Sequence, residues 1–545
     1  MTLEYSRKRV ALITGAASGL GASFADCLAR ENYDLVLVDR NEKLLKAGAE
    51  DIARRHAVSV HVIQQDLTRP EAVANIRAEC DRLKVSVDFL INNAGCYLTK
   101  LVHELPWPVI EDNIQLLLNV VLEMTHNFLP DMTRQRWGRI INVASVSGFM
   151  PGGVGVATYN ATKTFLIPFT EALNFELEGT GIHVSAVCPG FMKTNLFVNS
   201  GLPDVRDTVP GFMWLDPRQV AEKSIAAVMR NQPVYVAGLI NRGIVTVAKF
   251  VPRLLLRERT RIFHRSVHAR LASPDRSALH EKNLKRVALV TGATSGIGAS
   301  FCKVLAAEGC NIILVARRED LLRRSAEELA TQYGIEARVI VQDLTVPQAV
   351  EAICAKLEDI GWSVDILVNN AGYPVAKTFA SMSWAEVDAA LQLYIKSVVR
   401  LTHALVPGMT LRKWGRVINV ASLAAFEPGS FQSSLYSSSK AFQVAISESI
   451  AAELEGTGVT VTAVCPGFTK TEWMSKSNLE ISSVPKSLWM ESDAVAKIGL
   501  QAAMRGRAVC LVGTLPMRIV SLLFQLGPRR LIGSLLSKKR RKMAR

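Results

Sequence analysis

The chain has 545 residues and a formal net charge of +15, and 49% of its residues are hydrophobic. No apolar run reaches the 18 residues of a membrane-spanning helix, and the nine cysteines include no CxxC pair. A spanning segment, a disulfide framework and a metal site are therefore not expected. The length accommodates two domains of ordinary size.

A repeat with a period of 277 residues organises the chain. The segment TGAASGLG at 14–21 returns as TGATSGIG at 291–298, and NNAG at 92–95 returns at 369–372. A period of this length is a whole domain and not a solenoid unit. We predict a first domain over residues 1–240, a basic helical linker over 241–283, a second domain over 284–515 and a basic tail over 516–545.

In the first copy, apolar runs at 10–13 and 34–38 flank a glycine-rich turn and a helical segment at 22–30. Strand, turn, helix and strand in this order make the βαβ unit of a parallel sheet. Further apolar runs, separated by segments of helix length, occur at 60–63, 89–91, 139–143 and 183–187. We predict an α/β fold with two doubly wound parallel-sheet (Rossmann) domains in tandem, each followed by a basic, apolar helical segment.

The glycine-rich turn leads from the first strand of each copy into a helix. Backbone N–H groups and the positive end of the helix dipole then point at one place, where a pyrophosphate group fits. The residues expected to line this site are Gly15, Ser18, Gly19, Leu20 and Gly21 in the first copy and Gly292, Ser295, Gly296, Ile297 and Gly298 in the second.

The two copies differ at the end of the second strand. The first copy has Asp39 there, whereas the second has Ala316 followed by Arg317 and Arg318. A carboxylate accepts both ribose hydroxyls of NAD and repels a 2′-phosphate, while guanidinium groups bind that phosphate in a fork. We therefore predict NAD as the cofactor of the first domain and NADP as that of the second. The alternative for the two arginines is a pair of solvated surface charges.

A tyrosine and a lysine four residues apart lie on the same face of one predicted helix in each copy. A nearby cation lowers the pKa of a tyrosine from about 10, which allows the phenol to exchange a proton near neutral pH. A serine fourteen residues before each tyrosine, at a strand end, can hold a carbonyl oxygen while hydride moves to or from the carbon. These candidate catalytic residues are Ser145, Tyr159 and Lys163 in the first copy and Ser422, Tyr436 and Lys440 in the second.

Together, the TGxxxGxG turn, NNAG, the serine, the YxxxK motif and a following PG pair resemble the short-chain dehydrogenase/reductase superfamily. The resemblance covers both domains and leaves only the basic segments outside. It implies that the tyrosine is the acid/base, that the lysine also holds the nicotinamide ribose and that the serine orients the substrate. It further implies cofactor contacts at Asp66, Asn93 and Thr194 in the first copy and at Asp343, Asn370 and Thr471 in the second.

One residue that the superfamily usually contains is missing from both copies. This is an Asn in the helix after NNAG, part of a proton relay through the lysine and a water molecule; Leu117 and Tyr394 stand at its positions. Asn113, one turn earlier, can substitute in the first copy, and the Tyr394 hydroxyl can bind a water molecule in the second. We expect slower or altered proton exchange. Two alternatives stay open: one copy is a catalytically weak scaffold, or the chain senses nicotinamide nucleotides without turnover.

The loops expected to cover the substrate, residues 195–216 and 472–492, are rich in aromatic, leucine and methionine side chains. This composition favours a small apolar substrate, such as a 3-oxoacyl chain, a steroid or a polyketide. The predicted function is NAD(P)-dependent interconversion of a secondary alcohol and a ketone. If both cofactor predictions hold, the first domain oxidises and the second reduces; the simpler hypothesis is a gene duplication with one half kept mainly for the interface between the copies.

Residues 241–283 contribute +7 to the net charge and residues 516–545 contribute +9, and both segments also contain bulky apolar residues. Such helices suit an anionic membrane surface or the apolar surface of their own domain. No nucleic-acid recognition module accompanies the charge, so nucleic acid is not an expected partner. No secretory signal precedes the first strand, so we expect a cytoplasmic protein with peripheral membrane contact as an open alternative. The resemblance implies an internal pseudo-dimer or a homo-oligomer.

Overall fold

The structure is a computed structural model that describes residues 8–194, 209–251, 285–472 and 484–543. Most of the predicted linker, residues 252–283, and large parts of the two predicted substrate loops, residues 195–208 and 473–483, lie outside the described residues.

The first copy forms a seven-stranded parallel sheet with the strand order β3-β2-β1-β4-β5-β6-β7. Its strands are β1 (Val10–Thr14), β2 (Asp34–Asp39), β3 (Val60–Gln64), β4 (Val87–Asn92), β5 (Gly138–Val143), β6 (Ile182–Cys188) and β7 (Val234–Val236). The order reverses between β1 and β4, and ligands of such sheets bind at the carboxyl ends of the strands beside this reversal.

Alternate residues of β1 pack on opposite faces of the sheet, which is why the strands are apolar throughout. Ala11 and Ile13 pack with α1 (Gly19–Arg30), α2 (Glu42–Arg55) and α8 (Pro217–Met229). Val10 and Leu12 belong to the core of the opposite face. The helices of that face are α3 (Ala72–Arg82), α4 (Trp107–Ile114), α5 (Val120–Gln135) and α6 (Ala157–Glu176).

The second copy repeats this sheet with the order β10-β9-β8-β11-β12-β13-β16. Its strands are β8 (Val287–Thr291), β9 (Asn311–Ala316), β10 (Ala337–Val341), β11 (Ile366–Asn369), β12 (Gly415–Val420), β13 (Val459–Pro466) and β16 (Val509–Val512). Its helices are α11 (Gly296–Ala307), α12 (Glu319–Tyr333), α13 (Ala349–Ile360), α14 (Trp384–Leu391), α15 (Ser397–Leu411), α16 (Tyr436–Glu453) and α18 (Ser492–Met504). The predicted fold of two doubly wound parallel sheets in tandem is confirmed.

Helices follow the last strand of each copy. They are α9 (Leu239–Phe250) in the first copy, and α19 (Leu515–Leu526) and α20 (Arg529–Met543) in the second. Among the described residues, none of the helices combines the length and the apolar character needed to cross a bilayer.

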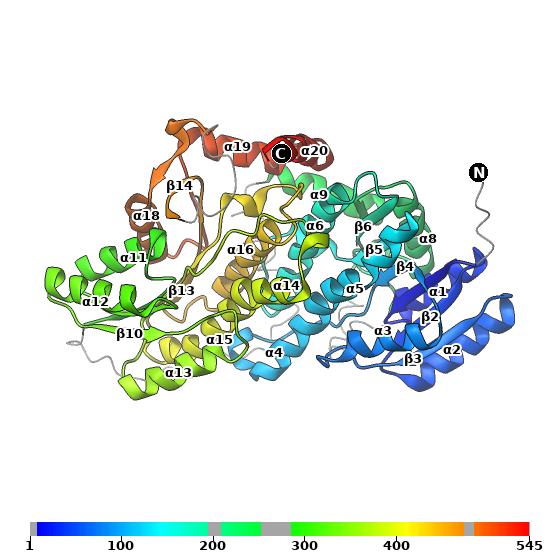
Figure 1. Ribbon diagram of the computed structural model, residues 1–545, viewed down its shortest axis with the longest axis horizontal. Helices are drawn as coiled ribbons and strands as arrows, with labels where there is room; N and C mark the ends of the chain where they lie inside the picture. The colour runs from blue at the N-terminus through cyan, green and yellow to red at the C-terminus, as the bar shows by residue number, and fades with distance from the viewer. Residues whose placement is uncertain (1–7, 195–208, 252–284, 473–483, 544–545) are drawn as a thin grey trace.

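The two copies pack against each other through α6 and α16, which lie side by side at the centre of Figure 1. Their hydrogen bonds are reciprocal. The Glu176 carboxylate accepts from the N–H of Phe379 at 2.7 Å, and Glu453, its equivalent in the repeat, accepts from the N–H of Val102 at 3.0 Å. The backbone residues Val102 and Phe379 are likewise equivalent. The same contact made in both directions is the mark of a two-fold, self-complementary interface.

The C-terminal helix α20 crosses from the second copy onto the first. The Arg529 guanidinium forms a fork with the Glu171 carboxylate on α6, with N···O distances of 2.8 and 2.7 Å. Glu171 also accepts from the N–H of Gly429 at 2.9 Å, and its side chain is only 4% exposed. This bidentate ion pair between Arg529 and the buried Glu171 carboxylate holds α20 against the first copy.

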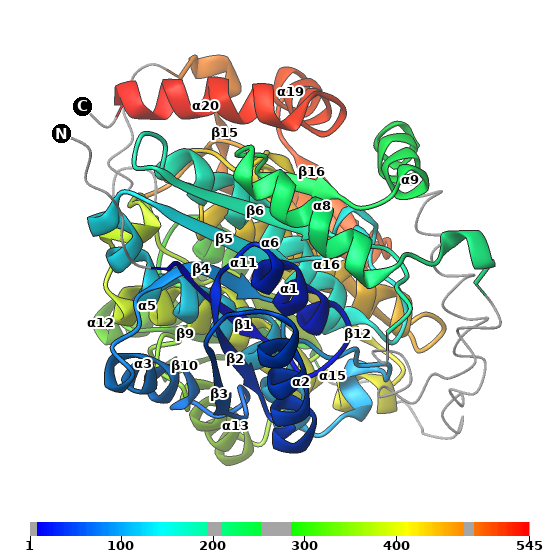
Figure 2. The ribbon, with the colours of Figure 1, turned by 90° about the vertical axis from the view of Figure 1, so that its right-hand side faces the viewer.

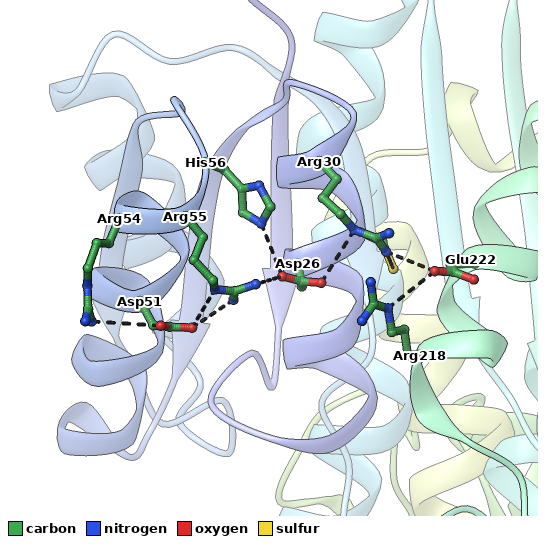
Figure 3. Close-up of polar contacts among 9 residues, drawn as sticks. Asp26, Arg30, Asp51, Arg54, Arg55, His56, Arg218 and Glu222 are labelled. Atoms are coloured by element: carbon green, nitrogen blue, oxygen red, sulfur yellow. Dashed lines mark hydrogen bonds and ion pairs between the residues drawn. The ribbon is translucent and has the colours of Figure 1, made fainter.

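An ionic network joins the outer helices of the first copy (Figure 3). The Asp26 carboxylate on α1 pairs with Arg55 and His56, and Arg30 on the same helix pairs with Glu222 on α8. In the second copy Lys303 stands where Asp26 does, and the corresponding helices are joined instead by the Ser300 hydroxyl bonding to Asp493 at 2.5 Å. The copies thus differ on their outer faces while the contacts between them repeat.

Candidate active site

The glycine turns have the geometry expected of a phosphate cradle. Gly15 and Gly19 have φ of +66° and +58°, in the left-handed region that favours glycine. A Cβ atom on Gly21 would lie 2.1 Å from the carbonyl oxygen of Gly15, so only glycine fits where α1 meets the turn. Ser18 and Leu20 flank these glycines. The second copy repeats the arrangement with Gly292, Ser295, Gly296, Ile297 and Gly298.

The Asn93 and Asn370 side chains bind the protein's own backbone. The Asn93 amide donates to the carbonyl oxygens of Thr14 and Gly15 at 2.9 and 3.2 Å, and Asn370 makes the same two bonds in the second copy. These residues, expected as cofactor contacts, hold the glycine turn against the neighbouring strand. We did not predict from the sequence that these two side chains position the glycine turn.

The residues expected to select the cofactor lie at the rim of each turn. Asp39 accepts from the N–H groups of Ala17 and Asn41 at 3.1 and 2.9 Å, so its carboxylate is fixed at the end of β2. In the second copy the Arg318 guanidinium donates to Thr294 in the turn at 3.0 Å, and Arg317 lies 3.5 Å from Asp343. By the repeat, Asp39 corresponds to Ala316, Arg40 to Arg317 and Asn41 to Arg318, so the second copy lacks the carboxylate and has one arginine more.

The remaining predicted cofactor residues lie near the same turns. The Asp66 and Asp343 carboxylates each accept from the backbone and hydroxyl of the threonine two residues later. Burial raises the pKa of both carboxyls, but these bonds outweigh it and leave the pKa below its ordinary value. A Cβ placed on Gly19 would touch the Thr194 methyl at 3.1 Å, and one on Gly296 would touch that of Thr471 at 2.9 Å.

In the first copy, Ser145, Tyr159 and Lys163 meet at the carboxyl end of β5. Ser145 begins the short turn after the strand and accepts from the N–H of Ser147 at 3.1 Å. Its hydroxyl also bonds to the Tyr159 phenol. The Lys163 ammonium donates to the carbonyl oxygen of Val143 at 2.7 Å and lies 5.7 Å from the centre of the Tyr159 ring.

In the second copy, Ser422, Tyr436 and Lys440 meet in the same way. Ser422 bonds to the Tyr436 phenol. The Lys440 ammonium donates to the carbonyl oxygen of Val420 at 2.8 Å and lies 5.8 Å from the centre of the Tyr436 ring. The three side chains predicted for each copy are thus brought together, beside the glycine turn of that copy.

The family model for short chain dehydrogenases matches residues 9–203 and 286–481. The chain belongs to this family. It is therefore an NAD(P)-dependent oxidoreductase, and its family domain is present twice.

Named relatives include several reductases. The 3-oxoacyl-(acyl-carrier-protein) reductase FabG of Aquifex aeolicus is 35% identical over 188 residues, which cover 34% of this chain and 75% of the relative. The very-long-chain 3-oxoacyl-CoA reductase of Anas platyrhynchos is 34% identical over 224 residues, covering 40% and 70%. A solved short-chain dehydrogenase from Sphingobium yanoikuyae in complex with NADPH is 29% identical with a TM-score of 0.40, covering 49% of this chain and all of that one.

Burial controls the protonation of both dehydrogenase sites. It raises the pKa of Tyr159 and Tyr436 to about 12, against a smaller opposing effect of the serine hydroxyls. It also lowers the pKa of Lys163 to about 8 and that of Lys440 to about 7. Desolvation disfavours both charged forms and so opposes the effect expected of the lysine on the tyrosine.

The positions of the missing Asn, Leu117 and Tyr394, lie in π-helical turns, Gln115–Asn119 and Gln392–Lys396. The expected substitute Asn113 donates instead to the Cys96 thiol at 3.1 Å. The Tyr394 hydroxyl accepts from the N–H of Tyr373 at 2.8 Å and donates to the carbonyl oxygen of that residue. Backbone bonds therefore direct this hydroxyl away from Lys440, whose ammonium lies over the Tyr394 ring instead.

Gln443 is a residue that sequence reasoning missed. Its amide oxygen accepts from the Lys440 ammonium at 2.9 Å, and its amide nitrogen donates to the carbonyl oxygen of Tyr394 at 2.9 Å. One buried side chain thus links the lysine to the π-helical turn. Leu166 is the equivalent in the first copy and has no polar group. The signal was present in the sequence, since position 443 is three residues after the motif lysine and on the same helical face.

Gln443→Leu is expected to lower the pKa of Lys440, because the buried ammonium loses an acceptor. A bond to a charged group contributes about 1.5–3 kcal/mol, which corresponds to about one pH unit or more. If the charged lysine supports turnover, activity is lost as pH rises through this pKa, so the falling limb moves to lower pH. We would measure kcat/KM against pH in full-length protein whose first site is silenced by Tyr159→Phe.

The reciprocal change Leu166→Gln, in a Tyr436→Phe background, serves as the matched control and should move the falling limb of the first site to higher pH. A uniform loss of kcat in Gln443→Leu, with no shift of the pH profile, would show that Gln443 contributes only to packing.

A cavity of about 580 Å³ joins these features in the second copy. It extends from Arg318 and the glycine turn to Tyr436 and Lys440. The wall on the substrate side includes Met517 of α19 and Leu536 of α20, so the C-terminal helices complete the site.

Proposed function

We propose that this dehydrogenase interconverts secondary alcohols and ketones at two sites, with Tyr159 and Tyr436 exchanging the proton of the substrate oxygen. The observation that carries the proposal is the joint placement of serine, tyrosine and lysine beside a glycine turn in both copies. The close approach of Gly21 to the backbone of Gly15 supports binding of a dinucleotide, because the position has no room for a side chain and such glycines are typical of dinucleotide-binding turns.

A bound nicotinamide supplies or accepts the hydride. In the reducing direction, the Ser422 hydroxyl holds the carbonyl oxygen of the substrate and Tyr436 donates its proton to the oxygen as negative charge develops. A phenol whose pKa is about 12 holds that proton throughout the physiological range. In the oxidising direction the phenolate form must accept the proton, and Lys163 or Lys440 stabilises it when charged.

The substrate that we propose is a ketone or alcohol on an apolar body, such as a 3-oxoacyl chain. Met517 and Leu536 in the wall of the second cavity support an apolar body. Two relatives are named as a 3-oxoacyl-(acyl-carrier-protein) reductase and a very-long-chain 3-oxoacyl-CoA reductase.

We further propose that the copies form an internal pseudo-dimer and that both are active. The reciprocal bonds of Glu176 and Glu453 support the pairing. A second pair of bonds supports it too: the His126 imidazole contacts the carbonyl oxygen of Met382 at 2.9 Å, and His403 contacts that of Leu105 at 2.7 Å.

The two sites are proposed to prefer different cofactors, NAD at the first and NADP at the second. Asp39→Ala is expected to weaken NAD binding at the first site, and the double change Arg317→Ala/Arg318→Ala to weaken NADPH binding at the second. Each loss should be about tenfold to a hundredfold, the range for one or two hydrogen bonds to a charged group. Titration of protein fluorescence with each cofactor measures both.

Arg323→Ala is the matched control, since this exposed arginine on α12 pairs with Glu319 and not with the turn. It should leave both affinities unchanged. If neither test variant separates the two cofactors, the proposed division between the copies is wrong, and the scaffold alternative for one copy gains support.

A further inference from the structure

The helices after the last strand of each copy expose the same apolar positions. Gly238 and Gly513 follow the last strand of each copy. Three residues of α9 and three of α19 lie at the same distances in sequence after these glycines and so form equivalent pairs. Their side chains are between 36% and 71% exposed. The pairs are Ile240 with Leu515, Ile244 with Ile519, and Val247 with Leu522. Single exposed apolar residues are common on protein surfaces, but here the exposed residues form a row, and the row occurs in both copies.

The helices that carry these rows are neighbours. Helices α9 and α19 contact each other, and α20 continues from α19. Both ribbon views place α19 and α20 along the same edge (Figures 1 and 2). Helix α20 adds Leu531 and Leu535, which are 58% and 59% exposed. We call the outer surface of these three helices the tail face.

The tail face is also basic. The three helices also carry exposed lysines and arginines, none of which has an acidic partner among the described residues. Residues 516–545 contain no acid at all. The exposed basic residues are Arg242, Arg518, Arg530, Lys538, Lys539 and Lys542.

The inner sides of the same helices contact the rest of the protein. Ser521 and Ser537 are buried, Arg529 binds Glu171, and Met517 and Leu536 line the second cavity. Because the inner sides of these helices already contact the protein, the outer apolar rows stay exposed to solvent. Helices of 12 and 15 residues with one apolar face and basic flanks have the character of helices that lie in the plane of a membrane interface.

We propose that the tail face docks on an anionic bilayer surface, and that the apolar substrate reaches the second cavity from the bilayer past Met517 and Leu536. Charge favours this occupant over a second copy of the chain, because a two-fold contact would bring two basic faces together. Acidic lipids instead attract the lysines and arginines while the apolar rows enter the interface. The entry route rests on the proposed function; the docking does not.

The test is flotation of the full chain with vesicles of phosphatidylcholine alone and of phosphatidylcholine with phosphatidylglycerol. We expect binding to the anionic vesicles only. The double change Leu522→Glu/Leu523→Glu should weaken it by about tenfold or more, since it removes two apolar contacts and adds repelled charge. Leu411→Glu is the control: Leu411 is 70% exposed on α15, away from the tail face, and its change should have no effect.

No binding to anionic vesicles, or equal binding by Leu522→Glu/Leu523→Glu, would overturn the proposal; the second result would place the membrane contact elsewhere in the chain. A dimer of the wild-type protein that the double change dissolves would overturn it as well, by showing a second copy on the tail face. Reduction of a small water-soluble ketone is measured in parallel. Activity without flotation contradicts only the docking, and flotation without activity contradicts only the proposed function.

Discussion

Tyr436→Phe is expected to abolish ketone reduction at the second site while NADPH still binds. The change removes the only atom of the side chain that can give a proton to the substrate oxygen. General acid catalysis contributes about 10²–10⁴-fold, and a loss of this size in kcat is expected. The aromatic ring, which packs edge-on to Tyr394 with ring centres 6.1 Å apart, is retained. Steady-state reduction with NADPH and a fluorescence titration separate turnover from binding.

Tyr159→Phe is the matched change in the first copy, and it should remove NAD-dependent oxidation while leaving NADPH-dependent reduction in place. Tyr333→Phe, at the end of α12 and outside both sites, should alter neither reaction. If one Tyr→Phe change alone stopped both reactions, the two sites would not act independently. If neither change affected kcat, the proton would have to come from another group.

The meeting of serine, tyrosine and lysine in each copy could be predicted from the sequence, because the fold brings residues at these spacings to one edge of the sheet. Parallel strands of a doubly wound sheet end at one edge, so Ser145 after one strand and Tyr159 on the next helix must meet there. The constant offset of 277 residues then transfers the whole site to the second copy. Local glycine patterns are equally predictive, since the left-handed φ of Gly15 and the close approach at Gly21 allow no other residue.

What the sequence did not predict depends on burial or on contacts between distant segments. The pKa of Tyr159 was expected to fall through its lysine, but burial affects both groups and that burial is set by the whole domain. The position of Gln443 between Lys440 and the Tyr394 carbonyl requires the π-helical turn. This turn cannot be recognised from the sequence. The Arg529–Glu171 pair joins residues 358 positions apart, and no local pattern relates them.

The fork between Arg529 and Glu171 leads to the largest expected effect on stability. Arg529→Ala leaves the Glu171 carboxylate, which is 4% exposed, with the N–H of Gly429 as its remaining hydrogen-bond donor among the described residues. Breaking a buried pair by removing one partner costs about 3–5 kcal/mol, because the remaining charge is uncompensated. Since α20 also walls the second cavity, we expect a lower midpoint of urea unfolding and a weaker NADPH-dependent reduction in the same variant.

Two comparisons assign this loss to the buried charge. Arg541→Ala removes a guanidinium from the same helix whose carboxylate partner Glu178 is 63% exposed. It also removes a bond to the carbonyl oxygen of Phe175 and a contact with the Phe431 ring, so the cost should be about 1–2 kcal/mol and below that of Arg529→Ala. Glu171→Met in the Arg529→Met background removes both charges and should recover most of the stability, as apolar replacement of buried pairs often does. An Arg529→Ala midpoint no lower than that of Arg541→Ala would mean that packing alone holds α20, through the close approach of Gly533 to the Phe175 ring.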